Sequence, residues 1–102
     1  GTNLASGGSL IFHSECEMRY ITGCLDALIA SGHKAMEPLP ERYADWYERT
    51  QAELKTMVWS QPSIKHSFYK NEDGVVHSLS PWRLVDFWSW TRSPDADDFV
   101  LQ

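Results

Sequence analysis

The spacing of apolar residues in the first third of the chain predicts one long helix over residues 9–31. Apolar side chains recur there at steps of three and four, the period of one helix face: Leu10, Ile11, Met18, Ile21, Leu25, Leu28 and Ile29. A second apolar stripe runs beside the first: Phe12, Cys16, Tyr20, Cys24 and Ala27. We therefore expect neighbours to contact this helix from more than one side, and Gly32 to end it.

A second helix is predicted for residues 40–59, after an irregular stretch at 32–40. Its apolar positions follow the helical period, and its other face is charged. Pro40 suits a first helical turn because its missing N–H would have no partner there.

The rest of the chain alternates between strand and helix patterns. Residues 66–79 predict a β-hairpin whose turn uses Gly74 for a positive φ. Ser80 and Pro81 predict the start of a helix over residues 80–92, and residues 99–101 are consistent with a short last strand. The predicted fold class is α+β, in a single unit of residues 1–102 with two long helices, a β-hairpin and a C-terminal helix.

Composition narrows the function classes. The net charge of −5 argues against nucleic-acid binding, which needs a basic surface. The chain contains 13% aromatic residues, including five tryptophans, and exposed tryptophan is typical of a partner surface. Cys16 and Cys24 would lie about 12 Å apart on one helix, too far for a disulfide. Free thiols, with no long apolar run, predict a cytoplasmic protein that does not enter a membrane.

The titratable residues do not form a recognisable catalytic or metal-binding pattern. His13 has Glu15 and Glu17 nearby, but residues two apart on a helix project to different sides. His66 and His77 are interpreted as surface or hydrogen-bonded histidines. No G-x-S-x-G motif accompanies the serines. We predict neither a metal site nor a catalytic residue within this chain.

A glycine-rich loop leads directly into the first predicted helix. Gly7 and Gly8 lack a Cβ, so a ligand could approach the backbone closely. The helix start offers the N–H groups of Ser9, Leu10 and Ile11 to an anionic or carbonyl oxygen. The same pattern also fits an ordinary helix N-cap.

Two segments, GTNLASGGSLIFHSECEMRYI and MVWSQPSIKHSFYKNEDGVVHSLSPWRLVDFW, resemble the C-terminal part of flavin-dependent Baeyer–Villiger monooxygenases. The resemblance is strongest to those acting on aryl ketones such as 4-hydroxyacetophenone, and it covers essentially the whole chain. Such enzymes have two dinucleotide-binding domains, use FAD and NADPH, and oxidise ketones to esters or lactones with O₂.

This chain contains no G-x-G-x-x-G after a strand and no F-x-G-x-x-x-H-x-x-x-W fingerprint. The resemblance therefore implies the C-terminal part of the FAD domain, inactive alone and without FAD or NADPH of its own. Its partners would be the remaining N-terminal FAD and NADPH domains and a ketone substrate.

The resemblance also assigns roles to residues near the N-terminus. Residues 1–8 would form an active-site loop. One set would line the substrate cavity: Thr2, Asn3, Leu4 and Leu10. Another would face the pyrimidine edge of FAD: Ser9, Leu10 and Ile11. Backbone N–H groups at a helix start stabilise the electron density that builds up at that edge on reduction.

Phe68 stands where the family usually has tryptophan, in a loop that closes over NADP. Phenylalanine can stack on the cofactor but has no indole N–H to donate. A core aromatic side chain on a strand is the alternative interpretation of Phe68.

A different class of protein also fits the composition. A free-standing helical module could use its tryptophans to bind another protein or to form a homo-oligomer. Such a module would remain monodisperse without any flavin.

Overall fold

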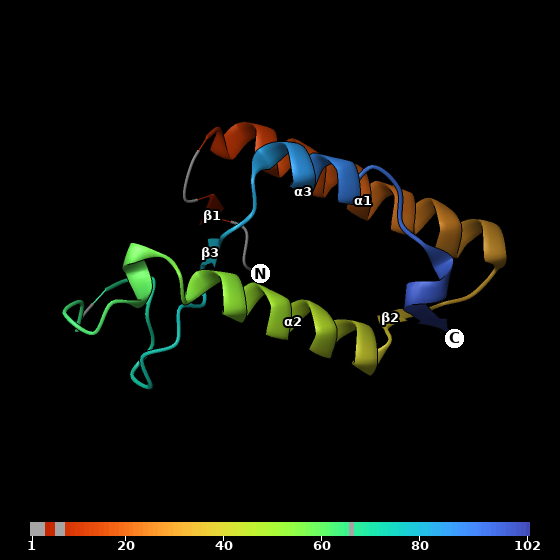
Figure 1. The fold of residues 1–102 in the computed structure, drawn as a ribbon. Helices are drawn as coiled ribbons and strands as arrows, with labels where there is room; N and C mark the ends of the chain where they lie inside the picture. Colours follow the sequence, from red (N-terminus) through yellow and green to blue (C-terminus); the bar gives the residue numbers. More distant parts are fainter. Residues whose placement is uncertain (1–3, 6–7, 66) are drawn as a thin grey trace.

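The computed structural model describes residues 4–5, 8–65 and 67–102, which contain three α-helices and four short strands (Figure 1). The helices are α1 (Leu10–Ser31), α2 (Pro40–Leu54) and α3 (Leu84–Trp90). The strands are β1 (Leu4–Ala5), β2 (Met36–Pro38), β3 (Leu79–Ser80) and β4 (Phe99–Leu101). Single 3₁₀ turns lie at Val58–Ser60 and Ala96–Asp98. The α+β class is confirmed.

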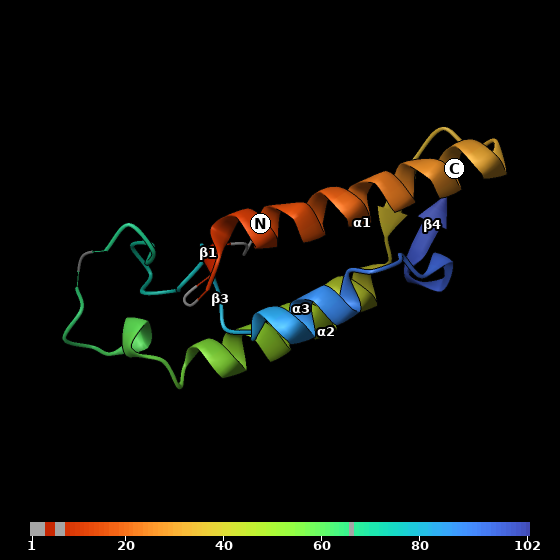
Figure 2. The same ribbon diagram turned by 90° about the horizontal axis from the view of Figure 1, so that it is seen from above.

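Helix α3 packs against both long helices, α1 and α2. It overlies α1 in Figure 1 and α2 in Figure 2, which is the same molecule turned by 90°. The imidazole of His13 on α1 stacks on the ring of Phe87, with centroids 3.8 Å apart. On the other side, Trp46 of α2 packs against Trp82 and Trp90, at centroid distances of 5.8 and 5.7 Å. Aromatic side chains therefore hold α3 to both helices.

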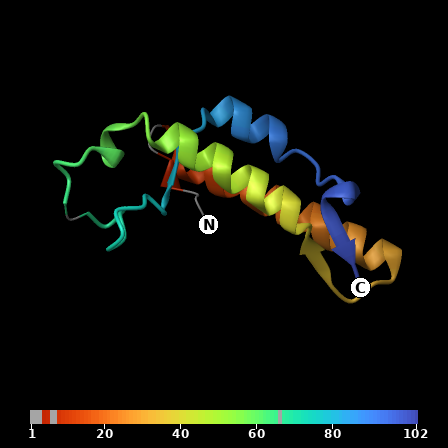
Figure 3. The same ribbon diagram turned by 60° about the horizontal axis from the view of Figure 1, so that its bottom comes forward.

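Two small sheets connect the ends of this arrangement. β1 pairs with β3 in parallel, and β2 pairs with β4 in an antiparallel register that places Glu37 opposite Val100. Figure 3 shows β2 and β4 side by side near the C-terminus. The last strand is confirmed. The prediction that residues 32–40 are irregular is wrong for Met36–Pro38, because β4 supplies backbone partners to these three residues.

Helix α1 follows its prediction closely. The Ser9 hydroxyl accepts a hydrogen bond from the Phe12 N–H at 3.2 Å. At the other end Gly32 has φ 72° and donates to the Ile29 carbonyl at 3.2 Å. Six large apolar side chains nevertheless remain at least half exposed, a set we name the α1 stripe: Leu10, Ile11, Met18, Ile21, Leu25 and Ile29. Each of these six side chains keeps 51–76% of its surface exposed among the described residues.

Helix α2 ends five residues earlier than predicted, at Leu54. The Thr56 hydroxyl donates to the Glu53 carbonyl at 2.7 Å, and the Ser60 hydroxyl donates to the Leu54 carbonyl at 2.6 Å. The Thr56 and Met57 N–H groups also donate to these two carbonyls, at 3.0 and 3.1 Å, so the last turn tightens to a 3₁₀ pattern and the helix ends. Met57 is extended, and a separate 3₁₀ turn follows.

The predicted hairpin over residues 66–79 does not form a regular ladder. Its turn is confirmed, since Gly74 has φ 81° and the Val75 N–H donates to the Asn71 carboxamide oxygen at 2.8 Å. Only isolated bridges involve Lys70, which pairs with both Ser67 and Val76. The pairing fails because the Ser67 segment turns back on itself, and because Leu79 and Ser80 pair with β1 instead. His66 lies outside the described residues.

Helix α3 begins later than predicted, because Ser80 belongs to β3 and is extended. The N-cap position is Arg83, and its guanidinium donates two hydrogen bonds to the Asp86 carboxylate, at 2.7 and 3.0 Å. These hydrogen bonds hold the pKa of Asp86 below its ordinary value. The helix ends at Trp90 with the Thr91 hydroxyl donating to the Phe87 carbonyl at 2.7 Å.

The buried core is small for the length of the chain. Leu54, Val76 and Leu79 form its centre, and three half-buried side chains pack around it: Met57, Trp59 and Tyr69. The radius of gyration is 15.4 Å and the molecule extends 50 × 27 × 19 Å, whereas a compact domain of this length has a radius of gyration of about 13 Å. The fold is elongated and leaves α1 largely uncovered.

Candidate functional site

The N-terminal end of α1 is the part of the predicted site that the structure describes best. Ser9 is extended and caps the helix, so the chain enters α1 without a break. The first helical turn contains no acidic residue. Helix geometry leaves the N–H groups of Leu10 and Ile11 without an intrahelical acceptor. The partial positive charge there would attract an anionic or carbonyl oxygen.

The structure brings Ser9, Leu10 and Ile11 together at one exposed helix end. The side chains of Leu10 and Ile11 are 53% and 74% exposed. The backbone of Leu4 pairs with that of Leu79, so the start of the chain is tied to β3. Thr2 and Asn3 lie outside the described residues. Of the predicted loop at residues 1–8, only residues 4–5 and 8 are described.

Gly8 has a different role from the one the glycine-rich pattern suggested. Its φ of 105° is a conformation that residues with a Cβ rarely adopt. A Cβ added there would overlap the side chain of Leu84, which opens α3. The space left by the missing Cβ is therefore taken by α3 rather than by a ligand. Gly7 lies outside the described residues.

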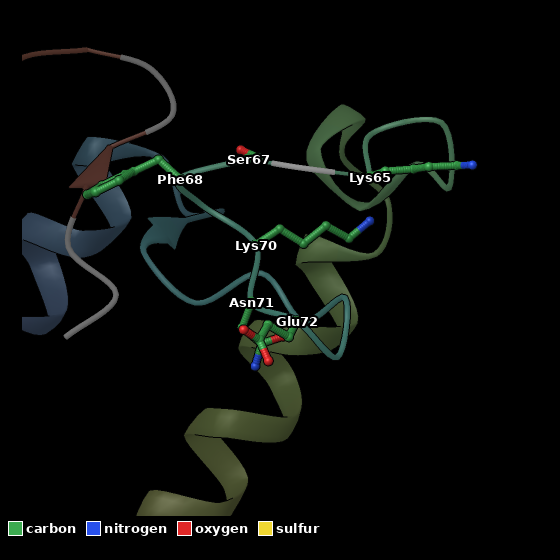
Figure 4. Close-up of a pocket in the computed structure, with 6 residues that line it drawn as sticks. All are labelled: Lys65, Ser67, Phe68, Lys70, Asn71 and Glu72. Atoms are coloured by element: carbon green, nitrogen blue, oxygen red, sulfur yellow. The ribbon is translucent and has the colours of Figure 1, made fainter.

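Phe68 lines an open pocket of about 600 Å³ (Figure 4). Its ring is 80% exposed and lies in a turn, so the alternative prediction of a core aromatic on a strand is wrong. In Figure 4 the ring points away from Lys65 and Lys70, which lie on the opposite side of the pocket. The Lys70 ammonium donates to the carbonyls of Gln61 and Ile64, both at 3.3 Å.

His13 is a buried polar residue whose environment the sequence did not reveal. It is 1% exposed, and neither ring nitrogen forms a hydrogen bond with any described residue. Its Nδ1 lies 3.9 Å from a carboxylate oxygen of Glu17, one turn along α1. The sequence feature that matches this burial is the spacing of His13 from Cys16, the other buried residue of α1. Residues three apart lie on the same face of a helix. His13 functions here as a stacking partner for Phe87.

The described residues contain no cluster of three or more His, Cys, Asp or Glu side chains able to hold a metal. Cys16 and Cys24 are free thiols, as predicted. Burial raises the pKa of Cys24 and of Tyr20. No helix in the described ranges has the length and apolar character needed to cross a membrane.

Comparison with known proteins gives two relatives. The chain is 31% identical over 101 residues to an uncharacterised monooxygenase, y4iD, of Sinorhizobium fredii. It is 26% identical over 103 residues to a Baeyer–Villiger monooxygenase of Streptomyces coelicolor. These similarities span 97% and 99% of this chain but only 15% and 20% of the two relatives. No protein-family model and no solved structure matches the chain. The chain is thus similar to a segment of much longer monooxygenases.

Proposed function

We propose that this chain is the C-terminal part of an FAD- and NADPH-dependent Baeyer–Villiger monooxygenase of the cytoplasm, which oxidises ketones, aryl ketones among them, to esters or lactones with O₂. The observation that carries the proposal is the similarity of almost the whole chain to 15–20% of two monooxygenases. The resemblance of both its N-terminal and its C-terminal segments to this family agrees with it.

The surface of α1 supports a role inside a larger protein. Six large apolar side chains of the α1 stripe are 51–76% exposed on one helix. Soluble monomers rarely leave a contiguous apolar surface of this kind uncovered. The remaining FAD and NADPH domains of the same enzyme would supply the cover, and burial of apolar area would hold the segment in place.

FAD, when bound, would supply the redox chemistry that activates O₂, with NADPH as the reductant. Within this chain, Ser9 shapes the start of α1, and the N–H groups of Leu10 and Ile11 would face the electron-rich edge of the flavin. No acidic side chain in that turn opposes an anionic partner. The Leu10 side chain, with Thr2, Asn3 and Leu4, would line the cavity for the ketone.

The free-standing interaction module is supported less well. It relied on exposed tryptophans, yet Trp46 and Trp82 are half-buried and packed against each other. Trp90, at 42% exposed, contacts both of those rings. These three tryptophans pack on one another, and the exposed α1 stripe forms a separate apolar surface.

The direct experiment compares the intact protein with the 102-residue chain. We expect the intact protein to bind FAD and to consume NADPH and O₂ when an aryl ketone is added, giving an ester detectable by mass spectrometry. The isolated chain should show no saturable FAD binding by flavin fluorescence, because one helix end offers few of the required contacts. Micromolar FAD binding to the isolated chain, or an intact protein without flavin, would contradict the proposal.

Phe68→Trp tests the proposed cofactor contact. The added indole N–H should lower the Kd for NADP⁺ of the intact enzyme about fivefold, the worth of one neutral hydrogen bond of about 1 kcal/mol. Because Phe68 is 80% exposed, thermal stability should stay unchanged. Val58→Leu, at another exposed apolar position, is the control. An unchanged Kd for NADP⁺ would remove Phe68 from the cofactor site.

A further inference from the structure

The start of α1 is held in place by a distant part of the chain. β1 lies just before α1 in the sequence and pairs in parallel with β3, with Ala5 opposite Ser80. Figures 1 and 2 both show these two strands side by side next to the start of α1. Leu79 and Ser80 of β3 are 3% and 1% exposed, so β1 pairs with a buried strand. The chain then continues from β3 into α3, which contacts the start of α1 a second time.

Two residues of α3, about one turn apart, make this second contact. The Leu84 side chain fills the space where Gly8 would carry a Cβ. The Phe87 ring stacks on His13, with centroids 3.8 Å apart. Gly8 directly precedes the N-cap residue Ser9, and His13 follows that cap by four positions. In many helices the side chains at these two positions pack on each other and fix the angle at which the chain enters the helix.

Gly8 cannot make that contact itself because it has no side chain. Leu84 takes the place of the missing group, and Phe87 packs on the other position. Helix α3 therefore supplies the packing that a helix start usually receives from its own residues. The direction in which the chain enters α1 then depends on Leu84.

Helix α3 is suited to this role because its own position is fixed. Trp90 packs against Trp46 of α2, with ring centroids 5.7 Å apart. At the start of α3 the Arg83 guanidinium donates to the Asp86 carboxylate at 2.7 Å. A side chain positions another group well only when packing and hydrogen bonds hold its own element in place.

We propose that Leu84 is a positioning residue that fixes the entry of the chain into α1, and with it the direction of the Leu10 and Ile11 N–H groups. The inference rests on the proposed function for one point, that these N–H groups face the flavin. Leu84 acts through Gly8 and needs no contact with the cofactor. Without its side chain the first turn of α1 would tilt, and the N–H groups would stabilise the reduced flavin less.

The first test is the two-electron reduction potential of the flavin in the intact protein, measured by reductive titration against a reference dye. In Leu84→Ala we expect the equilibrium to shift about threefold toward oxidised flavin, a fall of about 15 mV. Leu28→Ala is the matched control, the same substitution at another half-buried position, about 27 Å along α1 from Leu10. It should lower the midpoint of thermal unfolding, as Leu84→Ala does, and leave the potential unchanged.

Amide hydrogen exchange in the same proteins tests the contact without using the cofactor. The Phe12 N–H donates to the Ser9 hydroxyl at 3.2 Å, and the His13 N–H donates to the Ser9 carbonyl at 3.1 Å. Exchange at Phe12 and His13 therefore reports on the first turn of α1. We expect it to be about fivefold faster in Leu84→Ala and unchanged in Leu28→Ala.

Two milder substitutions separate positioning from folding. Leu84→Met keeps the side-chain volume, so the potential and the exchange rates should stay those of the unaltered protein. Leu84→Val should shift both in the same direction as Leu84→Ala by a smaller amount, and it replaces Leu84→Ala if that variant does not fold.

The proposal is overturned if exchange at Phe12 and His13 does not change in the Leu84 variants. It is also overturned if exchange accelerates while the flavin potential stays constant, or if Leu28→Ala gives the same shifts. An intact protein without flavin would contradict the monooxygenase proposal instead, and the exchange rates would still decide whether Leu84 fixes the start of α1.

Discussion

Replacing Gly8 with alanine is expected to destabilise the protein by about 3 kcal/mol or more. The φ of 105° strains a residue with a Cβ by about 1–3 kcal/mol. The new methyl group would also overlap the side chain of Leu84, and overpacking adds about 1–3 kcal/mol. Chemical denaturation of the intact protein measures the combined loss in free energy of unfolding.

Gly32→Ala is the matched control for this prediction. Gly32 also has a positive φ, 72°, but no atom lies within 4 Å of an added Cβ. Only the backbone cost of about 1–2 kcal/mol should appear there. In the Gly8→Ala background, Leu84→Ala should cost less than it does alone, because it relieves the overlap. Equal losses in Gly8→Ala and Gly32→Ala would show that α3 does not pack against Gly8.

The local signals in the sequence predicted α1 well because they do not depend on distant partners. The Ser9 cap, the apolar period and Gly32 together specify its two ends. The end of α2 was missed because a tightened last turn sets it, together with the Thr56 and Ser60 hydroxyls bound to backbone carbonyls, and no apolar pattern records these bonds. Propensity and period alone cannot detect such competition.

Pairing between distant segments accounts for the larger errors. Residues 75–79 have the pattern of a hairpin strand, but Leu79 and Ser80 pair with residues 4–5. The pairing of Ser80 with β1 also explains why α3 begins later than predicted, because Ser80 cannot be both an extended strand residue and a helix cap. Register between strands far apart in sequence depends on tertiary packing, which a short pattern does not contain.

The candidate site was predictable only in part. The exposed helix start at Ser9, Leu10 and Ile11 follows from sequence, because a cap and an apolar period place it. The packing of Leu84 against Gly8 arises from three-dimensional neighbours and had no separate signal.

A charge placed in the α1 stripe should destabilise the intact protein and leave the stability of the isolated chain nearly unchanged. In the intact protein, Ile21→Asp should lower the free energy of unfolding by about 3–5 kcal/mol and reduce FAD content, if the remaining domains cover the stripe. The variant loses apolar burial and places an unpaired carboxylate in the interface. In the isolated chain Ile21 is 51% exposed, so the same substitution should be nearly neutral for stability and should reduce aggregation.

Val58→Asp provides the comparison for Ile21→Asp. Val58 is 55% exposed, close to the 51% of Ile21, but it lies outside the stripe, in the turn after α2. We expect it to leave FAD content unchanged, as measured by the ratio of flavin to protein absorbance. If both substitutions are harmless in the intact protein, the stripe faces solvent there and the monooxygenase proposal loses its structural support. If only Ile21→Asp releases flavin, burial of α1 against the FAD domain is what joins this segment to the chemistry, because Ile21 lies about three turns from the helix start that would face the cofactor.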